Sequence, residues 1–153
     1  MKAQIYIEGD CPMTLEEENG ALIRADFGRK LEAGIPLKKT ELLSRAERQL
    51  EEYFQGKRKI FDLPLRYDGT EFQRQVWEAL LTIPYGETVS YQEIARRVGR
   101  ERAVRAVGTA IGRNPIGIVI PCHRVIGKDG GLHGFGGGLE KKKMLLELEE
   151  RGR

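Results

Sequence analysis

The sequence predicts an α+β fold, in which a small N-terminal α/β unit precedes a mostly helical C-terminal domain with a helix-turn-helix of winged-helix-like type. Two strand-like segments, 4–7 and 21–27, lie in the first part of the chain. In the second part, apolar residues recur at helical spacing behind capping motifs. A length of 153 residues suits one larger and one smaller domain, which we place at 69–153 and 1–68.

The N-terminal unit is predicted to contain one hairpin and one helix. Asn19-Gly20 is a hairpin-type turn signal ahead of the second strand segment. Between Thr40 and Phe54 the apolar residues have helical spacing, and Gly56 ends the pattern. These apolar residues are Leu42, Leu43, Ala46, Leu50, Tyr53 and Phe54. The span 57–69 is typical of a connector.

Capping motifs mark the helices of the C-terminal domain. Residues 70–73 (TEFQ) match a capping box, and the helix they open ends at the tight turn 83–86. Residues 90–93 (SYQE) match a second capping box, which opens a short helix that Gly99 closes. The last helix is expected from Leu139 to about Glu150, with Leu145 and Leu148 facing inward.

A further helix between these elements completes a helix-turn-helix candidate. It turns Val104, Val107, Gly108 and Ile111 inward and ends at Asn114-Pro115. At ~100° per residue, Arg102, Arg105 and Thr109 fall on the opposite, exposed side. Two short helices joined by a glycine-containing turn are typical of DNA-binding proteins, although many helical hairpins bind nothing.

Positive charge is concentrated in one stretch. The formal net charge is only +3, but residues 96–113 hold six arginines against one acid, Glu101. The arginines are Arg96, Arg97, Arg100, Arg102, Arg105 and Arg113. Such a patch favours DNA or RNA as partner, while a solvated charged helix face is the alternative. No apolar run approaches the ~20 residues of a membrane helix, and the first ten residues lack a signal-peptide pattern, so we expect a cytoplasmic protein without membrane contact.

The chemistry of the chain is concentrated at Cys122-His123. The chain has two cysteines and two histidines, so this pair uses half of each. A thiol becomes a strong nucleophile as the thiolate, which a nearby base helps to form. We expect 116–120 to be a buried strand or extended segment that delivers Cys122 to the site. If the chain stays extended at Cys122-His123, the two side chains point opposite ways, so His123 need not touch the sulfur and a bridging water molecule could relay the proton. A histidine base also needs an orienting acceptor, and an inert buried cysteine is the alternative.

Cofactor and metal motifs are missing from the sequence. There is no CxxC, no HExxH and no Cys/His cluster, so we expect no metal. The stretch 127–138 has seven glycines and can approach a ligand closely with its backbone, or can be a plain flexible loop. It matches neither a Walker A motif nor a full GxGxxG fingerprint, so we expect no nucleotide cofactor.

A run of ordered motifs resembles the O6-alkylguanine-DNA alkyltransferase family, whose members move an alkyl group from guanine onto their own cysteine. The resemblance covers about two-thirds of the chain, from Leu50 to Glu149, and only loosely the residues before it. The motifs, in order, are FDLPL, GTEFQRQVW, IPYGETVSY, RAVGTAIGRNP, IPCHRV, GGLHGFGGGLEKK and LLELE.

The resemblance implies a catalytic set. Cys122 would be the alkyl acceptor, His123 the base that activates it through water, and Glu149 the carboxylate that orients His123. Tyr91 would help to rotate the target nucleotide and donate a proton to the departing guanine. Asn114 would brace the turn that carries the cysteine.

The resemblance also implies a DNA surface and a base pocket. Arg105 would fill the space in the base stack that the flipped nucleotide vacates. Tyr91, Ser90, Arg102, Thr109 and Arg113 would contact DNA. Pro121, Val125, Phe135, Gly136 and Gly137 would line the pocket. Gly136 stands where family members often have serine, and Phe135 where tyrosine is common.

The implied function is repair of O6-alkylguanine in double-stranded DNA, and possibly of O4-alkylthymine, in one turnover per molecule. The family binds the minor groove, which suits repair at any sequence. We expect a monomer without cofactor. The alternatives are a non-catalytic damage sensor, which would typically carry tryptophan in place of Cys122, a helix-turn-helix regulator, and a cysteine hydrolase, which would need an oxyanion hole.

Overall fold

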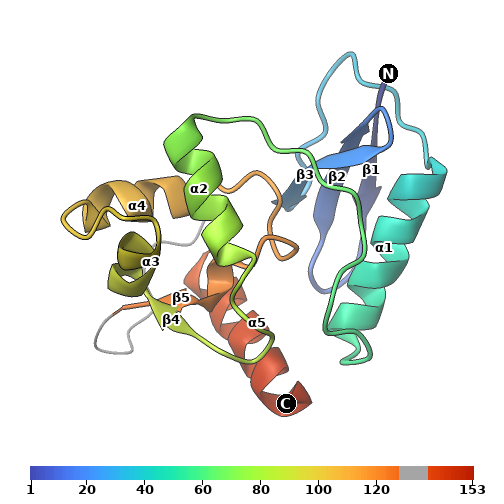
Figure 1. The fold of residues 1–153 in the computed structure, drawn as a ribbon. Helices are drawn as coiled ribbons and strands as arrows, with labels where there is room; N and C mark the ends of the chain where they lie inside the picture. The colour runs from blue at the N-terminus through green and yellow to red at the C-terminus, as the bar shows by residue number, and fades with distance from the viewer. Residues whose placement is uncertain (128–137) are drawn as a thin grey trace. The chain divides into compact units, whose positions relative to one another are not determined.

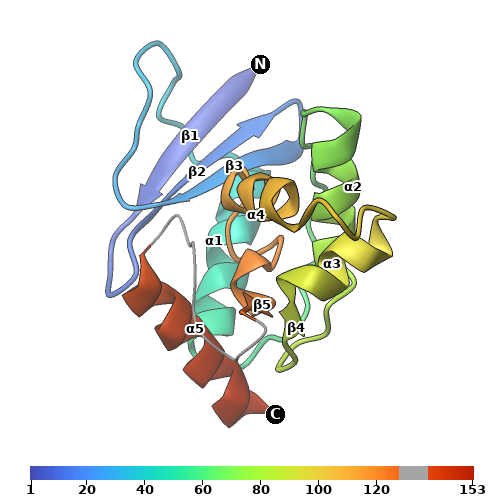
Figure 2. The ribbon, with the colours of Figure 1, turned by 90° about the vertical axis from the view of Figure 1, so that its left-hand side faces the viewer.

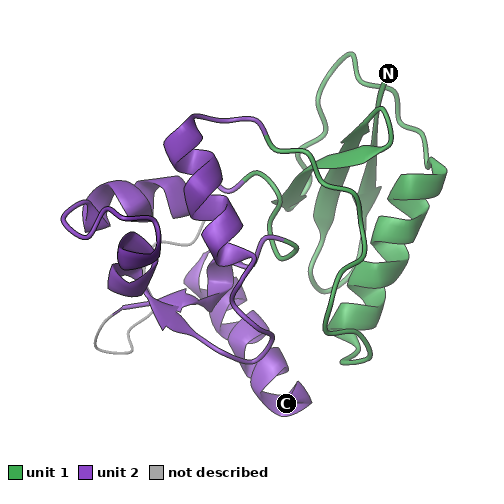
Figure 3. Cartoon of the chain, viewed as in Figure 1, with its two compact units in different colours: residues 1–67, 115–119 green, residues 68–114, 120–153 purple. Residues whose placement is uncertain are grey.

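The structure is a computed structural model that describes residues 1–127 and 138–153. The chain forms two compact units (Figure 3). Unit 1 consists of residues 1–67 and 115–119, and unit 2 of residues 68–114 and 120–153. A single division between residues 68 and 69 does not capture this arrangement, because residues 115–119 return to unit 1.

Unit 1 is a three-stranded antiparallel sheet with one helix against it (Figures 1 and 2). The strands lie in the order β1 (Lys2–Ile7), β2 (Met13–Glu18) and β3 (Ala21–Phe27), and the two predicted strands are confirmed. Strand β2 was not predicted, because its run of glutamates disfavours a strand. Its Met13 and Leu15 are nevertheless buried. The helix α1 (Glu41–Phe54) packs against all three strands.

Local signals at the turns of unit 1 are confirmed. Asn19 and Gly20 have φ values of 51° and 82° and join β2 to β3, as a two-residue hairpin turn requires. The side chain of Thr40 accepts a hydrogen bond from the Leu43 N–H at 3.1 Å and caps α1. The chain leaves this helix through Gly56, whose φ is 76°.

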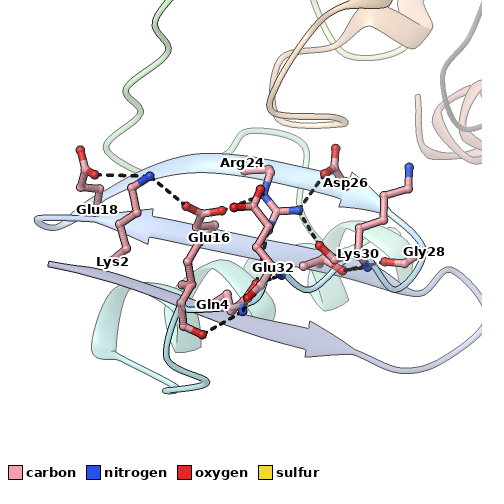
Figure 4. A network of polar contacts seen from close by, with 11 residues as sticks. Lys2, Gln4, Glu16, Glu18, Arg24, Asp26, Gly28, Lys30 and Glu32 are labelled. Atoms are coloured by element: carbon pink, nitrogen blue, oxygen red, sulfur yellow. Dashed lines mark hydrogen bonds and ion pairs between the residues drawn. The ribbon is translucent and has the colours of Figure 1, made fainter.

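A polar network covers the face of the sheet opposite α1 (Figure 4). Arg24 Nε lies 2.8 Å from Glu16, and Arg24 Nη1 lies 2.8 Å from Asp26 and 3.1 Å from the carbonyl oxygen of Lys30. The side chain of Glu16 is only 3% exposed. A carboxylate removed from water in this way depends on its cationic partner.

An Arg24→Ala protein should therefore lose about 2 kcal/mol of local stability in unit 1, because among the described residues it leaves the buried Glu16 with only the longer ion pair to Lys2 at 3.7 Å. Hydrogen exchange of the strand amides measures this loss within the sheet. Arg48→Ala, on the exposed side of α1, is the matched control and should change stability by less than about 0.5 kcal/mol. Equal protection in the two variants would contradict the role of the network.

Residues 115–119 join unit 1 through backbone hydrogen bonds to β3. The Ala25 N–H donates to Pro115 O at 3.0 Å, and the Gly117 N–H donates to Ala25 O at 2.9 Å. Ile116 and Ile118 are buried, as expected. The expected strand or extended segment is wrong, however, because the chain turns at Ile118, which has a φ of 69°. A β-branched residue rarely adopts this conformation, so no sequence pattern predicts the turn.

Unit 2 is mostly helical. Its helices are α2 (Glu71–Leu80), α3 (Tyr91–Arg97), α4 (Val104–Gly112) and α5 (Leu139–Gly152). Helices α2, α3 and α4 pack on one another, and the Trp77 indole N–H on α2 donates to Ala110 O on α4 at 2.8 Å. The chain between α3 and α4 turns at Gly99, which has a φ of 72°, so the predicted helix-turn-helix is present.

The two predicted capping boxes have different outcomes. The first is confirmed, because the side chains of Thr70 and Gln73 each cap the other's backbone N–H. Only half of the second forms: Ser90 Oγ accepts from the Glu93 N–H at 3.0 Å. The Glu93 carboxylate instead binds Arg96 and Arg97, which lower its pKa to about 2.

Short elements far apart in sequence meet within unit 2. Strand β4 (Val89–Ser90) pairs in parallel with β5 (Val125–Ile126), so the start of α3 lies beside the end of the 3₁₀ turn η1 (Cys122–Arg124). Helix α5 also packs against η1. Within the part of the chain that the structure describes, no helix is both long and apolar enough to cross a membrane.

Candidate active site

Cys122 is the first residue of the short turn η1, which a backbone hydrogen bond closes. The Arg124 N–H donates to Pro121 O at 3.0 Å, and this bond makes Cys122–Arg124 a 3₁₀ turn. The expected extended chain at Cys122-His123 is therefore wrong. Successive side chains of a 3₁₀ turn still point about 120° apart, so the thiol and the imidazole do not face each other and the water relay stays a prediction. Cys122 and His123 are both buried.

A buried carboxylate holds the histidine. His123 Nε2 lies 2.7 Å from Glu149 Oε2, and both side chains are at most 1% exposed. Arg124 donates to both oxygens of Glu149, from Nε at 2.9 Å and from Nη2 at 3.0 Å. The Gly86 N–H also donates to Glu149, at 3.0 Å. A carboxylate that receives these donors is an ionised acceptor, so Nε2 carries the imidazole proton and Nδ1 is the basic nitrogen.

Burial sets the resting charge of the pair. It lowers the pKa of His123, an effect that the hydrogen bond to Glu149 opposes, so the imidazole is neutral at pH 7. Burial also raises the pKa of Cys122, while a hydrogen bond from Asn114 and the charge of Lys142 oppose the rise. The resting site thus holds a thiol beside a neutral base, and the thiolate forms by proton transfer.

Asn114 connects the end of α4 to the segment before the cysteine. Its Nδ2 donates to Ile120 O at 2.8 Å. The carbonyl group it binds belongs to the residue two positions before Cys122, so the amide fixes the backbone that carries the thiol. The side chain therefore both restrains this backbone and favours the thiolate.

Tyr91 is brought to the site by the start of α3. It is the first residue of the helix, after the capping residue Ser90, and it is half-buried. Burial, followed by the negative charge of Cys122, raises the pKa of Tyr91. The phenol therefore keeps its proton at neutral pH and is available as a donor.

Four of the six candidate DNA-contacting residues are exposed on unit 2, and the other two, Ser90 and Tyr91, are half-buried at the start of α3. Arg102, Arg105, Thr109 and Arg113 are all exposed, as predicted for Arg102, Arg105 and Thr109. The three arginines form no ion pair within residues 1–127 and 138–153. Two of the six arginines in residues 96–113, Arg96 and Arg97, pair with Glu93. The positive charge of this stretch is therefore partly neutralised.

The expected pocket is described in part. Pro121 precedes η1, and Val125 follows it and pairs with Val89. Phe135, Gly136 and Gly137 lie outside the described residues. Among the described residues, His, Cys, Asp and Glu form no group of three or more that could hold a metal ion.

Two residues that the structure places in the site, Arg124 and Lys142, are not among the predicted site residues. Arg124 also donates to Ile83 O at 2.7 Å, so it connects Glu149 to the turn after α2. Lys142 is 0% exposed. Leu145 is buried as predicted, but the same face of α5 buries Lys142 and Glu149, whereas Leu148 is only half-buried. The spacing of Lys142, three residues before Leu145, was the signal that could have revealed it.

The chain matches known proteins over nearly its whole length. The family model described as 6-O-methylguanine DNA methyltransferase, DNA binding domain, matches residues 71–151. The model of the ribonuclease-like domain of the same enzyme matches residues 12–67. A methylated-DNA–protein-cysteine methyltransferase of Methanosarcina barkeri is 50% identical over 143 residues, which cover 91% of this chain and 90% of the relative.

Solved structures agree in fold. The O6-methylguanine methyltransferase of Mycobacterium tuberculosis has a TM-score of 0.90 and 44% identity, over 100% of this chain and 95% of that chain. The protein from the same organism in complex with DNA has a TM-score of 0.91 and 44% identity, over 98% of this chain and 94% of that chain.

Proposed function

Because this chain belongs to the family of the 6-O-methylguanine DNA methyltransferases, we propose that it repairs DNA by transferring the alkyl group of O6-alkylguanine to Sγ of its own Cys122. The observation that carries this proposal is the buried thiol next to a neutral imidazole that Glu149 holds at 2.7 Å. A cysteine that only fills space would not need this buried network of charged groups beside it.

The network supports the activation step. The Cys122 thiol gives its proton, through a water molecule, to Nδ1 of His123, and Glu149 stabilises the imidazolium that results. The thiolate then attacks the alkyl carbon. A bond forms between Sγ and this carbon, the bond between carbon and O6 breaks, and its electron pair leaves with the guanine.

Tyr91 supplies the proton that the departing guanine needs. Its phenol proton passes to the base, and the imidazolium and solvent restore that proton afterwards. The net reaction converts thiol and alkylated guanine into thioether and guanine. The thioether has no labile bond, so each molecule acts once, and the protein's own residues supply every group without a cofactor. Both O6-alkylguanine and O4-alkylthymine fit this chemistry.

The exposed arginine side of unit 2 supports binding to double-stranded DNA, and we assign the contacts to Ser90, Tyr91, Arg102, Thr109 and Arg113. A base within a duplex is out of reach of a buried thiol, so the nucleotide must rotate out, and Arg105 takes its place in the stack. Binding from the minor groove suits a repair protein, because this groove carries little sequence information.

Location and assembly follow from the same chemistry. The described catalytic residues come from α3, η1, α5 and the segment after α4 of one chain, which supports a monomer. A reactive thiol stays reduced in the cytoplasm, which we propose as the place of action.

Mass spectrometry of the intact protein tests the proposal, after mixing with a duplex that holds one O6-methylguanine. We expect a stoichiometric gain that corresponds to one methyl group in place of hydrogen, mapped by peptide analysis to Cys122. A folded, reduced protein without this gain would refute transfer, and would leave a DNA-binding protein of the same fold.

Arg105→Ala should slow transfer from duplex DNA about tenfold or more, because the cost of unstacking, a few kcal/mol, is no longer offset. The affinity for the duplex should fall much less, since the other arginines still contact phosphates. Single-turnover rates on duplex and single-stranded substrates measure the difference. An equal slowing on both would contradict a role in the base stack.

A further inference from the structure

Ile118 has a strained backbone conformation four residues before the candidate nucleophile. Its φ is 69°, and the Val119 N–H donates to Gly117 O at 2.8 Å, so residues 117–119 form a γ-turn of the rare type with a positive φ. Isoleucine, with its branched Cβ, is among the residues that adopt such a φ least readily. The described residues contain one other non-glycine residue with a positive φ, Asn19, and asparagine adopts this conformation far more readily.

The surrounding structure holds this turn in place. The Ile118 side chain is only 1% exposed, so its burial favours the strained conformation. The backbone before it is bound to β3 through Pro115 O and the Gly117 N–H. A Cβ atom on Gly117 would lie 3.2 Å from Ala25 O and 3.3 Å from the ring of Phe27, so this backbone lies close against the strand. Strain of this kind persists only where the surroundings enforce it, and it is concentrated at functional sites.

The turn lies within the short loop that leads to the nucleophile. Asn114 Nδ2 donates to Ile120 O at 2.8 Å, so the two ends of the loop 114–120 are joined. The chain has to turn back between these ends, and a γ-turn reverses it within three residues. Ile120 O also accepts from the Cys122 N–H at 2.8 Å, across Pro121, whose φ of −81° and ψ of 64° are those of an inverse γ-turn. One carbonyl group thus receives both the amide that closes the loop and the N–H of the nucleophile.

We propose that Ile118 is a positioning residue of the transfer reaction, whose left-handed backbone brings Ile120 O to Asn114 and so fixes the thiol of Cys122. This inference rests on the proposed function. Burial of the isoleucine offsets the strain, and the backbone of the nucleophile is set before DNA binds. If the turn opened, Ile120 O would move away from Asn114, and the hydrogen bond from Asn114 that favours the thiolate would no longer be held in place.

Substitution of Ile118 by alanine and by glycine tests the proposal. Both variants lose the side chain, but alanine keeps the Cβ that disfavours a positive φ, whereas glycine adopts this φ about as readily as a negative one. The left-handed conformation is at least about fivefold less populated for alanine. We therefore expect single-turnover transfer from an O6-methylguanine duplex to slow about tenfold or more in Ile118→Ala, and to be at least about threefold faster in Ile118→Gly than in Ile118→Ala.

Ile116 provides the matched control. It is fully buried, lies two residues earlier in the same loop and has no positive φ. Between Ile116→Ala and Ile116→Gly the ordinary order should hold, with the glycine variant no faster and no more stable, because glycine loses more conformational freedom on folding. The same order at position 118 would mean that only burial of the side chain matters, and would overturn the proposal.

Urea unfolding is a second measurement, for the case that Ile118→Ala is too unstable for transfer to be followed. The midpoint of Ile118→Gly should be higher than that of Ile118→Ala, because the native φ costs glycine no strain. A midpoint that is equal or lower would contradict the requirement for a left-handed residue and overturn the proposal.

Iodoacetamide measures the placement of the thiol without DNA. Its rate of reaction at Cys122, mapped by peptide analysis and followed against pH, gives the apparent pKa of the thiol. We expect this pKa to be higher in Ile118→Ala than in the unchanged protein, since the hydrogen bond from Asn114 lowers it, and to return towards its original value in Ile118→Gly. An unchanged pKa in a folded Ile118→Ala protein would assign Ile118 to the fold alone and overturn the proposal. Absence of transfer in the unchanged protein would instead refute the proposed function, and this inference with it, before any variant is compared.

Discussion

A Cys122→Ala protein should take up no methyl group from O6-methylguanine, while it binds the alkylated duplex nearly as tightly as the unchanged protein. Alanine has no nucleophile, so the attack on the alkyl carbon cannot occur by any other route in the site. The arginines expected to contact DNA are exposed on the surface and should not change, because Cys122 is buried. Intact mass and fluorescence anisotropy measure the two quantities.

Cys11→Ala is the control for this experiment. Cys11 is the second cysteine of the chain and is buried in unit 1, whereas the His123–Glu149 pair belongs to unit 2. We expect full methyl uptake by this variant. Uptake by Cys122→Ala that is lost in Cys11→Ala would mean that the acceptor has been misassigned.

Local chemistry explains which parts of the fold could be predicted. The Asn19-Gly20 turn, the Thr40 cap and the Thr70–Gln73 box each depend on a few adjacent residues, so the sequence predicts them directly. Strand β2 was not predicted because three consecutive glutamates, Glu16 to Glu18, follow its buried Met13 and Leu15. The cation that compensates Glu16 comes from another strand.

The geometry of the site depends on contacts that are distant in sequence. Strands β4 and β5 pair over only two residues, and this pairing brings Tyr91 towards Cys122. No local sequence pattern predicts so short a strand. Arg124 and Lys142 would be expected on the surface, because charged side chains are normally exposed to solvent. The pairing of His123 with Glu149 was predicted from the resemblance to the family. In the structure, His123 Nε2 lies 2.7 Å from Glu149 Oε2. Burial of the two cations became visible only in three dimensions.

Glu149→Gln should reduce methyl transfer by about 10²- to 10⁴-fold, because it removes the charge that stabilises the imidazolium of His123. The Glu149 carboxylate accepts from His123, Arg124 and the Gly86 N–H through two oxygens. Glutamine has only one oxygen, so its NH2 group must face at least one of these donors. If that NH2 group faces His123, the imidazole can accept from it only as the other tautomer, with the hydrogen on Nδ1. The base that should receive the thiol proton would then already carry one.

The same change should also destabilise unit 2, by about 3–5 kcal/mol, because Arg124 is left as a buried cation without its carboxylate. Urea unfolding followed by Trp77 fluorescence measures this, since Trp77 is buried within unit 2. Glu150→Gln is the control. Glu150 is the next residue on α5, with a side chain that is 71% exposed and pairs with Arg153 at 3.3 Å, so we expect less than about 1 kcal/mol there.

The two consequences of Glu149→Gln can be separated by removing the cation as well. A Glu149→Gln, Arg124→Met protein lacks both the Glu149 carboxylate and the buried guanidinium that it balances. Much of the lost stability should therefore return, because replacing a buried ion pair with uncharged groups is often neutral for stability. Transfer should remain low, because the imidazolium still lacks its counter-charge. Recovery of transfer together with stability would show that Glu149 serves only to hold the fold. Continued loss of transfer in a stable protein would instead assign the carboxylate to the chemistry of His123.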